Sequence, residues 1–285
     1  MEGLISAKIF HSRQPVTYSI AEQLLALPKL KVIQFHDIKP DEKTLNILND
    51  VIFKNRKDIT LRVYGYPDTW SDISFLNFLP DLERFDWDTA VFGSNEPLYK
   101  LKKLVHLGLG FTQPKPKISL QFVTDFSNTL ESLSLDGDYK DLLITIPTLK
   151  KLKSFWLTST KLKGFDFLQG LPIETIGNYG GRVESFDFLV NIQSLKKIWI
   201  KTNSKIKNID FIEELPNLEE IELQYVAKIT RFPKCDHLKK LKRIFAFECN
   251  RLEDISEVKK LKISDISISG SKLPGRHFKV EQKNQ

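Results

Sequence analysis

The sequence predicts a solenoid, a stack of repeated strand-and-turn units, because one short apolar pattern recurs along almost the whole chain. The pattern is an apolar residue, any residue, and a second residue that is almost always apolar. It returns every 21–28 residues. In solenoids with periods of this size, each unit packs only against its neighbours. The pairs are Ile33/Phe35, Leu61/Val63, Phe85/Trp87, Leu107/Leu109, Leu133/Leu135, Phe155/Leu157, Ile176/Asn178, Ile198/Ile200, Ile221/Leu223, Ile244/Ala246 and Ile266/Ile268.

Other positions repeat together with the pair and predict the outline of each unit. If the first residue of the pair is position 0, an apolar residue also stands at −3, as at Leu152 and Leu195. A small or polar residue often occupies +5, as at Thr160 and Asn203, and apolar residues return near +7 and again near +10 to +14. The pattern predicts a strand at the pair, a turn, and a return by loop or short helix. The predicted fold is α/β, with a curved, concave parallel sheet and a convex side of loops and 3₁₀ or short helices.

The N-terminal part has a different pattern. Residues 19–27 and 41–56 predict helices, and residues 30–35 predict a strand. We therefore expect residues 1–58 to form an α/β cap continuous with the solenoid, because an open end would expose the core. Repeats are expected over residues 59–270. Residues 271–285 are polar and predict a C-terminal tail, either a loose cap or disordered.

Several segments carry a resemblance to a known family. Residues 194–212, SLKKIWIKTNSKIKNIDFI, match the pattern L-x-x-L-x-L-x-x-N/C-x-L of leucine-rich repeats. Four further segments resemble the short repeats, of about 22 residues, of bacterial internalins: KLKGFDFL, RVESFDFL, IKNIDFI and RLEDISEV. The resemblance covers roughly residues 60–270 and implies a leucine-rich repeat solenoid whose strands are backed by 3₁₀ turns or short helices.

The chain departs from these relatives in two ways. Position +5 is asparagine only at Asn203, and it is Ala90, Gly181 and Val226 in other repeats. Internalins are secreted and surface-anchored, whereas residues 1–13 lack the basic region and apolar run of a secretion signal. The resemblance therefore does not imply an adhesin.

Composition favours a cytoplasmic protein whose charge is unevenly distributed along the chain. The 285 residues include two cysteines and no apolar run of membrane-spanning length. The net charge is +7, but residues 1–145 hold 17 Lys/Arg and 19 Asp/Glu, whereas residues 146–262 hold 22 and 15. The later repeats would attract an acidic partner, unless their lysines serve only solubility.

No motif predicts an enzyme, a cofactor or a metal. The sequence lacks GxxxxGK[ST], HExxH and GxSxG. Asp136 and Asp138 begin like a calcium loop, but Lys140 occupies the next ligand position. Asp86 and Asp88 are predicted to form a solvated acidic patch.

The alternation of side chains along a strand identifies a candidate binding face. If positions 0 and +2 point into the core, positions −1, +1 and +3 point outward on the concave face. Large aromatic and charged residues occupy these outward positions in the later repeats. The candidate partner-binding residues are Trp156, Tyr179, Lys197, Trp199, Lys201, Glu222, Arg243, Phe245 and Phe247.

The sequence thus predicts a protein–protein interaction module, possible roles being an intracellular inhibitor or a bacterial toxin-neutralising (immunity) protein. One alternative is nucleic-acid binding through a basic edge built from the pairs Lys102/Lys103, Lys150/Lys151, Lys239/Lys240 and Lys259/Lys260. Nucleic acid is disfavoured because these lysines and the aromatic residues lie on different faces. A second alternative is a targeting subunit of an enzyme that uses Asp86, Asp88, Asp136 and Asp138.

Overall fold

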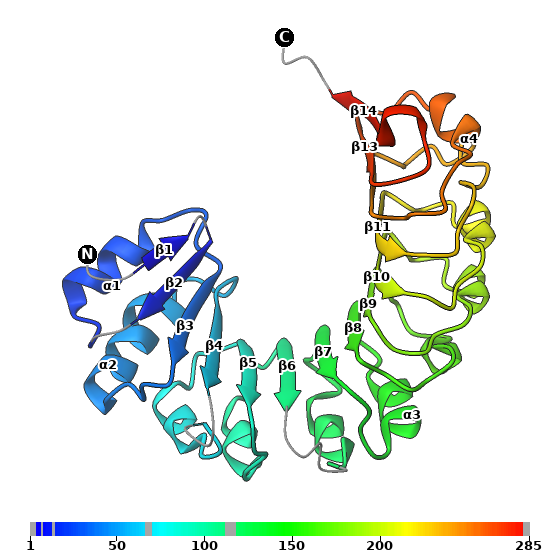
Figure 1. Ribbon diagram of the computed structural model, residues 1–285. Coiled ribbons are helices and arrows are strands. Elements are labelled where there is room, and N and C mark those ends of the chain that lie inside the picture. Colours follow the sequence, from blue (N-terminus) through cyan, green and yellow to red (C-terminus); the bar gives the residue numbers. More distant parts are fainter. Residues whose placement is uncertain (1–3, 7, 13–14, 66–69, 112–117, 282–285) are drawn as a thin grey trace. The chain divides into compact units, whose positions relative to one another are not determined.

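The computed structural model describes residues 4–6, 8–12, 15–65, 70–111 and 118–281 (Figure 1). By the density of internal contacts the chain divides into two compact units. Unit 1 comprises Met1–Leu135 and Tyr139–Thr145, and unit 2 comprises Asp136–Asp138 and Ile146–Gln285.

The strands of unit 1 follow one another in the sheet in chain order. A hairpin of β1 and β2 pairs antiparallel, and the pairs from β2 to β6 are parallel. The described strands are β1 (Leu4–Ser6), β2 (Ile9–Ser12), β3 (Val32–His36), β4 (Thr60–Gly65), β5 (Arg84–Thr89), β6 (His106–Phe111) and β7 (Ser132–Asp136). The sequence did not predict the first hairpin.

Helical segments return the chain between the strands of unit 1. Its first helix begins after Thr17, whose hydroxyl accepts a hydrogen bond from the Ile20 amide, and its second begins after Asp41, which caps the Thr44 amide. The segments are α1 (Tyr18–Leu25), α2 (Glu42–Ile47), the π-helical η1 (Leu48–Phe53), the 3₁₀ helices η2 (Ser74–Phe78), η3 (Glu96–Lys100) and η4 (Gln121–Phe126), and α3 (Leu142–Thr145). The α/β character predicted for the N-terminal region is confirmed, although the helix predicted over residues 41–56 is two segments of different pitch.

Unit 2 repeats one strand-and-turn unit. Strands β8 (Ser154–Thr158), β9 (Thr175–Tyr179), β10 (Lys197–Asn203), β11 (Glu220–Val226), β12 (Arg243–Phe247) and β13 (Asp265–Ser269) pair in parallel, each with its neighbours in the chain. The chain returns through 3₁₀ helices η5 (Ile146–Thr148), η6 (Asp166–Leu168), η7 (Asp187–Asn191) and η8 (Asp210–Glu214), then α4 (Ser256–Lys259) and η9 (Pro274–Arg276). This is the unit that the apolar spacing predicted.

The C-terminal end of unit 2 is more regular than its sequence suggested. Strand β14 (His277–Glu281) pairs antiparallel with β13 from Asp265 to Ser269. It covers a sheet edge whose backbone amides and carbonyls would otherwise be left without partners.

The repeated apolar pair forms the core of both units. Every member of the eleven pairs is buried, including Asn178 and Ala246. In unit 1, Ile33, Leu61, Phe85 and Leu107 stand opposite one another in successive strands, and in unit 2 the row runs from Phe155 to Ile266. Burial alternates along the strands. Positions −1, +1 and +3 therefore lie on the other side of each sheet, here called the open face.

A left-handed residue stands within one position of the last residue of each parallel strand of unit 2. The residue at position +4 has φ between 51° and 69° in every repeat from β8 to β13: Ser159, Gly180, Thr202, Tyr225, Glu248 and Gly270. A residue with this φ turns the chain out of the extended conformation. The open face of each strand thus ends at position +3.

Candidate functional site

A pair of tryptophans stands on the open face of unit 2, over its first three strands. Trp156 in β8 and Trp199 in β10 both stand opposite Gly177 in β9. A Cβ atom on Gly177 would overlap the Trp156 indole, so the indole occupies the space that this glycine leaves free. The two indoles meet across β9 in an edge-to-face arrangement, with centroids 4.7 Å apart and an interplanar angle of 75°.

The two indole N–H groups differ in their surroundings. The Trp156 Nε1–H donates to the Ser154 hydroxyl at 3.0 Å. The Trp199 Nε1–H is buried and has no acceptor among the described residues. A buried donor without an acceptor costs free energy. The isolated protein therefore does not satisfy all the polar groups of this pair.

Charged side chains stand beside the tryptophan pair. The Lys201 ammonium lies over the Tyr179 ring, 5.0 Å from its centroid, in register across β9 and β10. The Lys197 ammonium forms an ion pair of 2.7 Å with Glu220 of β11. Tyr179 is one of the most exposed apolar side chains, with 49% of its surface accessible.

Farther along the sheet, Arg243 joins two strands. Its Nη1 lies 3.7 Å from Glu222 of β11, and its Nε lies 3.2 Å from Asp265 of β13. Its guanidinium also covers the Phe245 ring, with 5.6 Å between its Cζ and the ring centroid. Glu222 accepts a hydrogen bond of 2.5 Å from the Gln224 amide.

Phe247 makes an edge-to-face contact with Tyr225, with ring centroids 5.5 Å apart. Tyr225 was not among the predicted residues, because it stands at +4, where the left-handed φ interrupts the alternation of side chains.

The nine predicted residues form local pairs rather than one cluster. The structure brings together Trp156 with Trp199, Tyr179 with Lys201, and Arg243 with Glu222 and Phe245. Lys197 and Phe247 contact Glu220 and Tyr225, which were not predicted. Gly177 lies within β9, between the two tryptophans.

The acidic residues of the enzyme alternative are engaged in structural contacts. In unit 1, the Nε and Nη2 atoms of Arg62 each lie 2.6 Å from a carboxylate oxygen of Asp88. In unit 2, the Thr158 and Thr160 hydroxyls donate to Asp136 at 2.6 Å and to Asp138 at 2.5 Å. Within the described ranges, no group of three or more His, Cys, Asp and Glu side chains could hold a metal ion.

Asp86 takes part in a Ser–His–Asp chain on the open face of unit 1. His106 Nε2 lies 2.8 Å from an Asp86 oxygen, and His106 Nδ1 lies 2.8 Å from the Ser132 hydroxyl. The Asp86 carboxylate fills the space beside Gly108. The Ser132 amide, one possible donor to an oxyanion, instead donates to the Val105 carbonyl at 3.0 Å. This arrangement links strands β5, β6 and β7.

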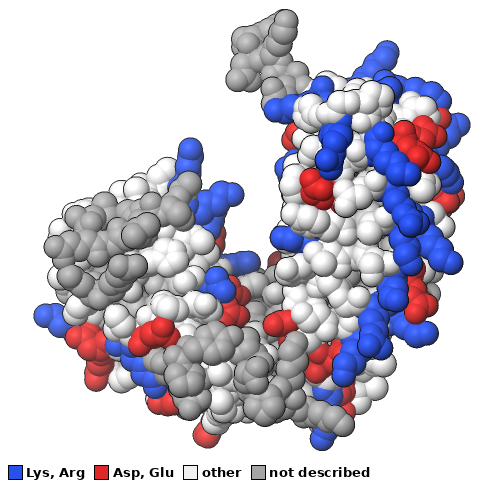
Figure 2. Space-filling view, viewed as in Figure 1, with Lys and Arg blue, Asp and Glu red and all other residues white. Residues whose placement is uncertain are grey.

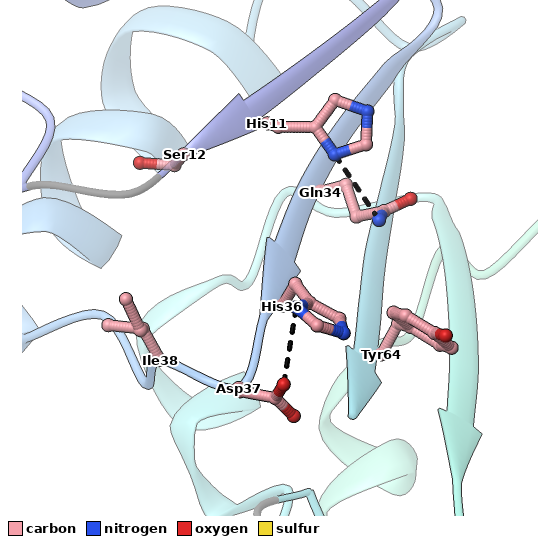
Figure 3. A pocket seen from close by; sticks show the side chains of 7 residues that line it. All are labelled: His11, Ser12, Gln34, His36, Asp37, Ile38 and Tyr64. Carbon is pink, nitrogen blue, oxygen red and sulfur yellow. Dashed lines mark hydrogen bonds and ion pairs between the residues drawn. The ribbon is translucent and has the colours of Figure 1, made fainter. Parts of the chain in front are cut away.

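A pocket of about 610 Å³ opens in unit 1 (Figure 3). The His36 and Tyr64 rings stack with centroids 4.6 Å apart, and Asp37 lies 3.2 Å from His36 Nδ1. On the other side, the Gln34 amide lies 3.4 Å from His11 Nδ1. The pocket is lined by His11, Ser12, Gln34, His36, Asp37, Ile38 and Tyr64. Its ring faces and apolar lining suit a small apolar group.

Comparisons with known proteins bear on the fold. No protein-family model and no curated protein matches the chain. Among solved structures, an internalin of Listeria monocytogenes aligns with 94% of this chain and 80% of its own, at 15% identity and a TM-score of 0.51. A leucine-rich repeat protein of Leptospira interrogans aligns with 92% of this chain and 77% of its own, at 16% identity and a TM-score of 0.46. The predicted fold class, a leucine-rich repeat solenoid, is confirmed by the repeated unit and the internalin likeness.

No described helix is long and apolar enough to span a membrane.

Proposed function

We propose that this chain is a protein–protein interaction module that binds a protein partner on the open face of unit 2. The observation that carries the proposal is the Trp156–Trp199 pair, two half-buried indoles packed across Gly177 on the open face. Trp, Tyr and Arg dominate the free energy of protein interfaces when they lie near the centre of a contact. The proposed partner-binding residues are the nine that the sequence predicted.

A preformed sheet favours this mechanism. The anchors stand on paired strands, so binding orders little backbone. The indole rings already contact each other, which limits the rotamers that binding must fix. The buried Trp199 N–H without an acceptor supports a surface that a partner completes, because buried donors of native proteins usually have an acceptor and a partner would supply it.

The charges around the tryptophan pair favour a protein rather than a uniform polyanion. Lys197 is paired with Glu220, and Arg243 is shared between Glu222 and Asp265. Charges of both signs at the rim orient a partner with a complementary mixture.

As part of the same proposal, the protein is a cytoplasmic inhibitor or immunity protein of a bacterial cell. An inhibitor can act by covering the functional surface of its partner. This requires a rigid face with buried aromatic anchors and no catalytic group on the inhibitor. Cys235 and Cys249 are free and buried, which supports a reducing compartment.

The test is affinity capture of partners from the source cell with three variants. The first is Trp156→Ala/Trp199→Ala, which removes both anchors. The second is Gly177→Ala, which keeps both indoles but displaces Trp156, because the added Cβ takes its space. The third is Tyr18→Ala, a matched control that removes an exposed aromatic of α1 in unit 1. Circular dichroism verifies the folding of each variant.

We expect one protein to be captured by the wild type and the Tyr18 variant and lost from the double variant. Each anchor should contribute about 2 kcal/mol or more, so the loss of affinity for the purified partner should exceed roughly 100-fold. Gly177→Ala should weaken binding by an intermediate amount. A partner held equally by all variants would move the site away from this face, and recovery of nucleic acid alone would contradict a protein partner.

A further inference from the structure

A second surface of unit 2 carries a periodic charge. Each of the six repeats has one Lys or Arg in the turn after its strand, directly before the apolar residue near +7. The six residues are Lys161, Arg182, Lys205, Lys228, Arg251 and Lys272, here called the cation column. All six are exposed.

The turn geometry sets these side chains in a row. The residues that follow Arg182, Lys205 and Arg251 are buried, so each cation points away from the core. The backbones stack from repeat to repeat, because the Arg182 amide donates to the Thr160 carbonyl and the Lys272 amide to the Leu252 carbonyl. With repeats ~4.7–4.9 Å apart, as in paired strands, the row is about 25 Å long.

Five of the six members of the cation column have no ion-pair partner among the described residues. Across the described residues, the side chains of Lys161, Arg182, Lys205, Lys228 and Arg251 form no ion pair, and Lys272 lies 3.5 Å from Glu253. The opposite ends of the strands differ, because Lys196 pairs with Glu174 at 3.0 Å and Lys242 with Glu219 at 2.8 Å. Figure 2 shows cationic side chains following one another along unit 2, with acidic ones beside them.

A shallow polar pocket of about 360 Å³ lies beside the middle of the column. Lys205, Lys207 and Lys228 line it, together with the acids Glu184 and Asp187. Glu184 is held 3.5 Å from Lys163. Three lysines and two acidic residues therefore line one concavity.

Two exposed tyrosines stand next to this column. Tyr179 and Tyr225 come three residues before Arg182 and Lys228, and their exposed fractions are 49% and 45%. Tyr225 has a φ of 55°, which is strained for a bulky side chain. Ring faces thus border the row of positive charge.

We propose that the edge of unit 2 formed by the cation column binds single-stranded nucleic acid. The column follows the phosphodiester backbone, and Tyr179 and Tyr225 stack against bases, which is how proteins bind single strands without reading sequence. A charged column alone would suit any linear polyanion, and the exposed rings beside it distinguish nucleic acid from an acidic protein. This activity goes beyond the proposed function. It uses the turns rather than the tryptophan pair and shares only Tyr179 with the proposed partner-binding residues.

The test is fluorescence anisotropy of the full chain with three labelled probes of equal length, about 12 units each. They are an oligothymidylate, an abasic oligonucleotide with the same phosphates, and oligoglutamate. We expect the oligothymidylate to bind at least tenfold more tightly than either other probe, because base stacking adds to the charge attraction. The logarithm of its affinity should fall with the logarithm of salt concentration with a slope of about −0.7 per phosphate contacted.

Matched variants test the site itself. Lys205→Gln/Lys228→Gln should weaken oligothymidylate binding about tenfold or more and reduce the magnitude of the salt slope by about 1.4. Lys259→Gln/Lys262→Gln removes the same charge outside the column, from exposed positions, and should bind like the wild type. Tyr225→Asn, which suits the left-handed φ, should weaken binding to the oligothymidylate but not to the abasic probe.

Three results would overturn the proposal: no oligothymidylate binding, equal binding of the abasic or glutamate probe, or equal losses in the two lysine double variants. Equal binding of oligoglutamate would assign the edge to acidic proteins instead. Because Trp156 and Trp199 are untouched, this outcome is independent of the partner-capture experiment.

Discussion

At the scale of single residues, position +4 determines where the open face ends. In unit 2 this position is left-handed in all six repeats, but only Gly180 and Gly270 are glycines. The others, Ser159, Thr202, Tyr225 and Glu248, adopt a conformation that L residues reach at a cost of roughly 1–2 kcal/mol. The stacked repeats impose this backbone on whatever residue occupies the position.

Thr202 gives the clearest test, because it is β-branched, exposed and has a φ of 55°. We expect Thr202→Gly to stabilise the protein by about 0.5–1 kcal/mol, since relief of strain exceeds the added backbone entropy of the unfolded chain. The measurement is urea unfolding followed by circular dichroism. Thr175→Gly is the matched control, because Thr175 lies in extended β9, and it should destabilise by a similar amount. Equal destabilisation by both changes would show that position +4 is not strained.

At the scale of secondary-structure elements, one arginine fastens α1 to the sheet of unit 1. Arg56 donates to the carbonyls of Leu25, Leu27 and Leu30 at 3.0–3.4 Å, at and beyond the C-terminal end of α1. Asp58 holds the guanidinium through two bonds of 2.7 and 3.0 Å and also receives Lys31 at 2.6 Å. The hydrogen bond from Arg56 lowers the pKa of the Asp58 carboxyl below its usual range.

This lowered pKa predicts a pH-dependent stability. The charged Asp58 stabilises the fold fully above its unfolded pKa of about 3.9, and the contribution is lost as the pH falls through the lower folded pKa. We expect Asp58→Asn to reduce the free energy of unfolding by about 1 kcal/mol at pH 7, a modest figure because Asp58 is 43% exposed. The difference from the wild type should shrink between about pH 5 and pH 2.

Chemical denaturation across this pH range measures the effect. Asp50→Asn removes an equal charge from an exposed position of η1 and serves as the control. A difference for Asp58→Asn that stays constant with pH would exclude the proposed role of its carboxylate.

At the scale of the whole molecule, the sequence predicted the repeated parts and missed the terminal hairpins. The period alone placed Asn178 and Ala246 in the core, although neither is a large apolar residue, because register fixes the position of every strand residue. Strands β1, β2 and β14 lie outside the period, and strands of three to five residues give a weak local signal.

The candidate site was predictable as a face but not as a set of contacts. Alternation placed Trp156, Trp199 and Phe245 on the open face correctly. The contacts of these side chains depend on the residues that lie between them. The contact between the two tryptophans requires Gly177, and this requirement follows only from the position of β9 between β8 and β10. The cation column was predictable from the sequence, since each member precedes the apolar residue near +7. The sequence analysis instead assigned the basic edge to the lysine pairs that precede the strands.

The two thiols report the integrity of the stacked repeats of unit 2. Cys249 occupies position +5, with its sulfur 3.8 Å from the Leu223 carbonyl, and Cys235 lies in the turn region before β12. Burial raises the pKa of Cys235 to about 12 and that of Cys249 to about 11. Both groups therefore stay protonated at pH 8, and the thiol is a poor nucleophile.

We expect neither cysteine of the native protein to react with a disulfide reagent such as dithionitrobenzoate at pH 8. Cys235 and Cys249 lie on either side of β12, in parts of the stack that pack on each other. Both thiols should therefore become reactive together in urea, over the range where circular dichroism reports unfolding. Ser204→Cys supplies a positive control, since Ser204 is exposed in the turn after β10 and its thiol should react at once. Rapid labelling of Cys235 or Cys249 without urea would mean that the later repeats open locally. The rigid face and the regular cation column, on which both proposals depend, would then not persist in solution.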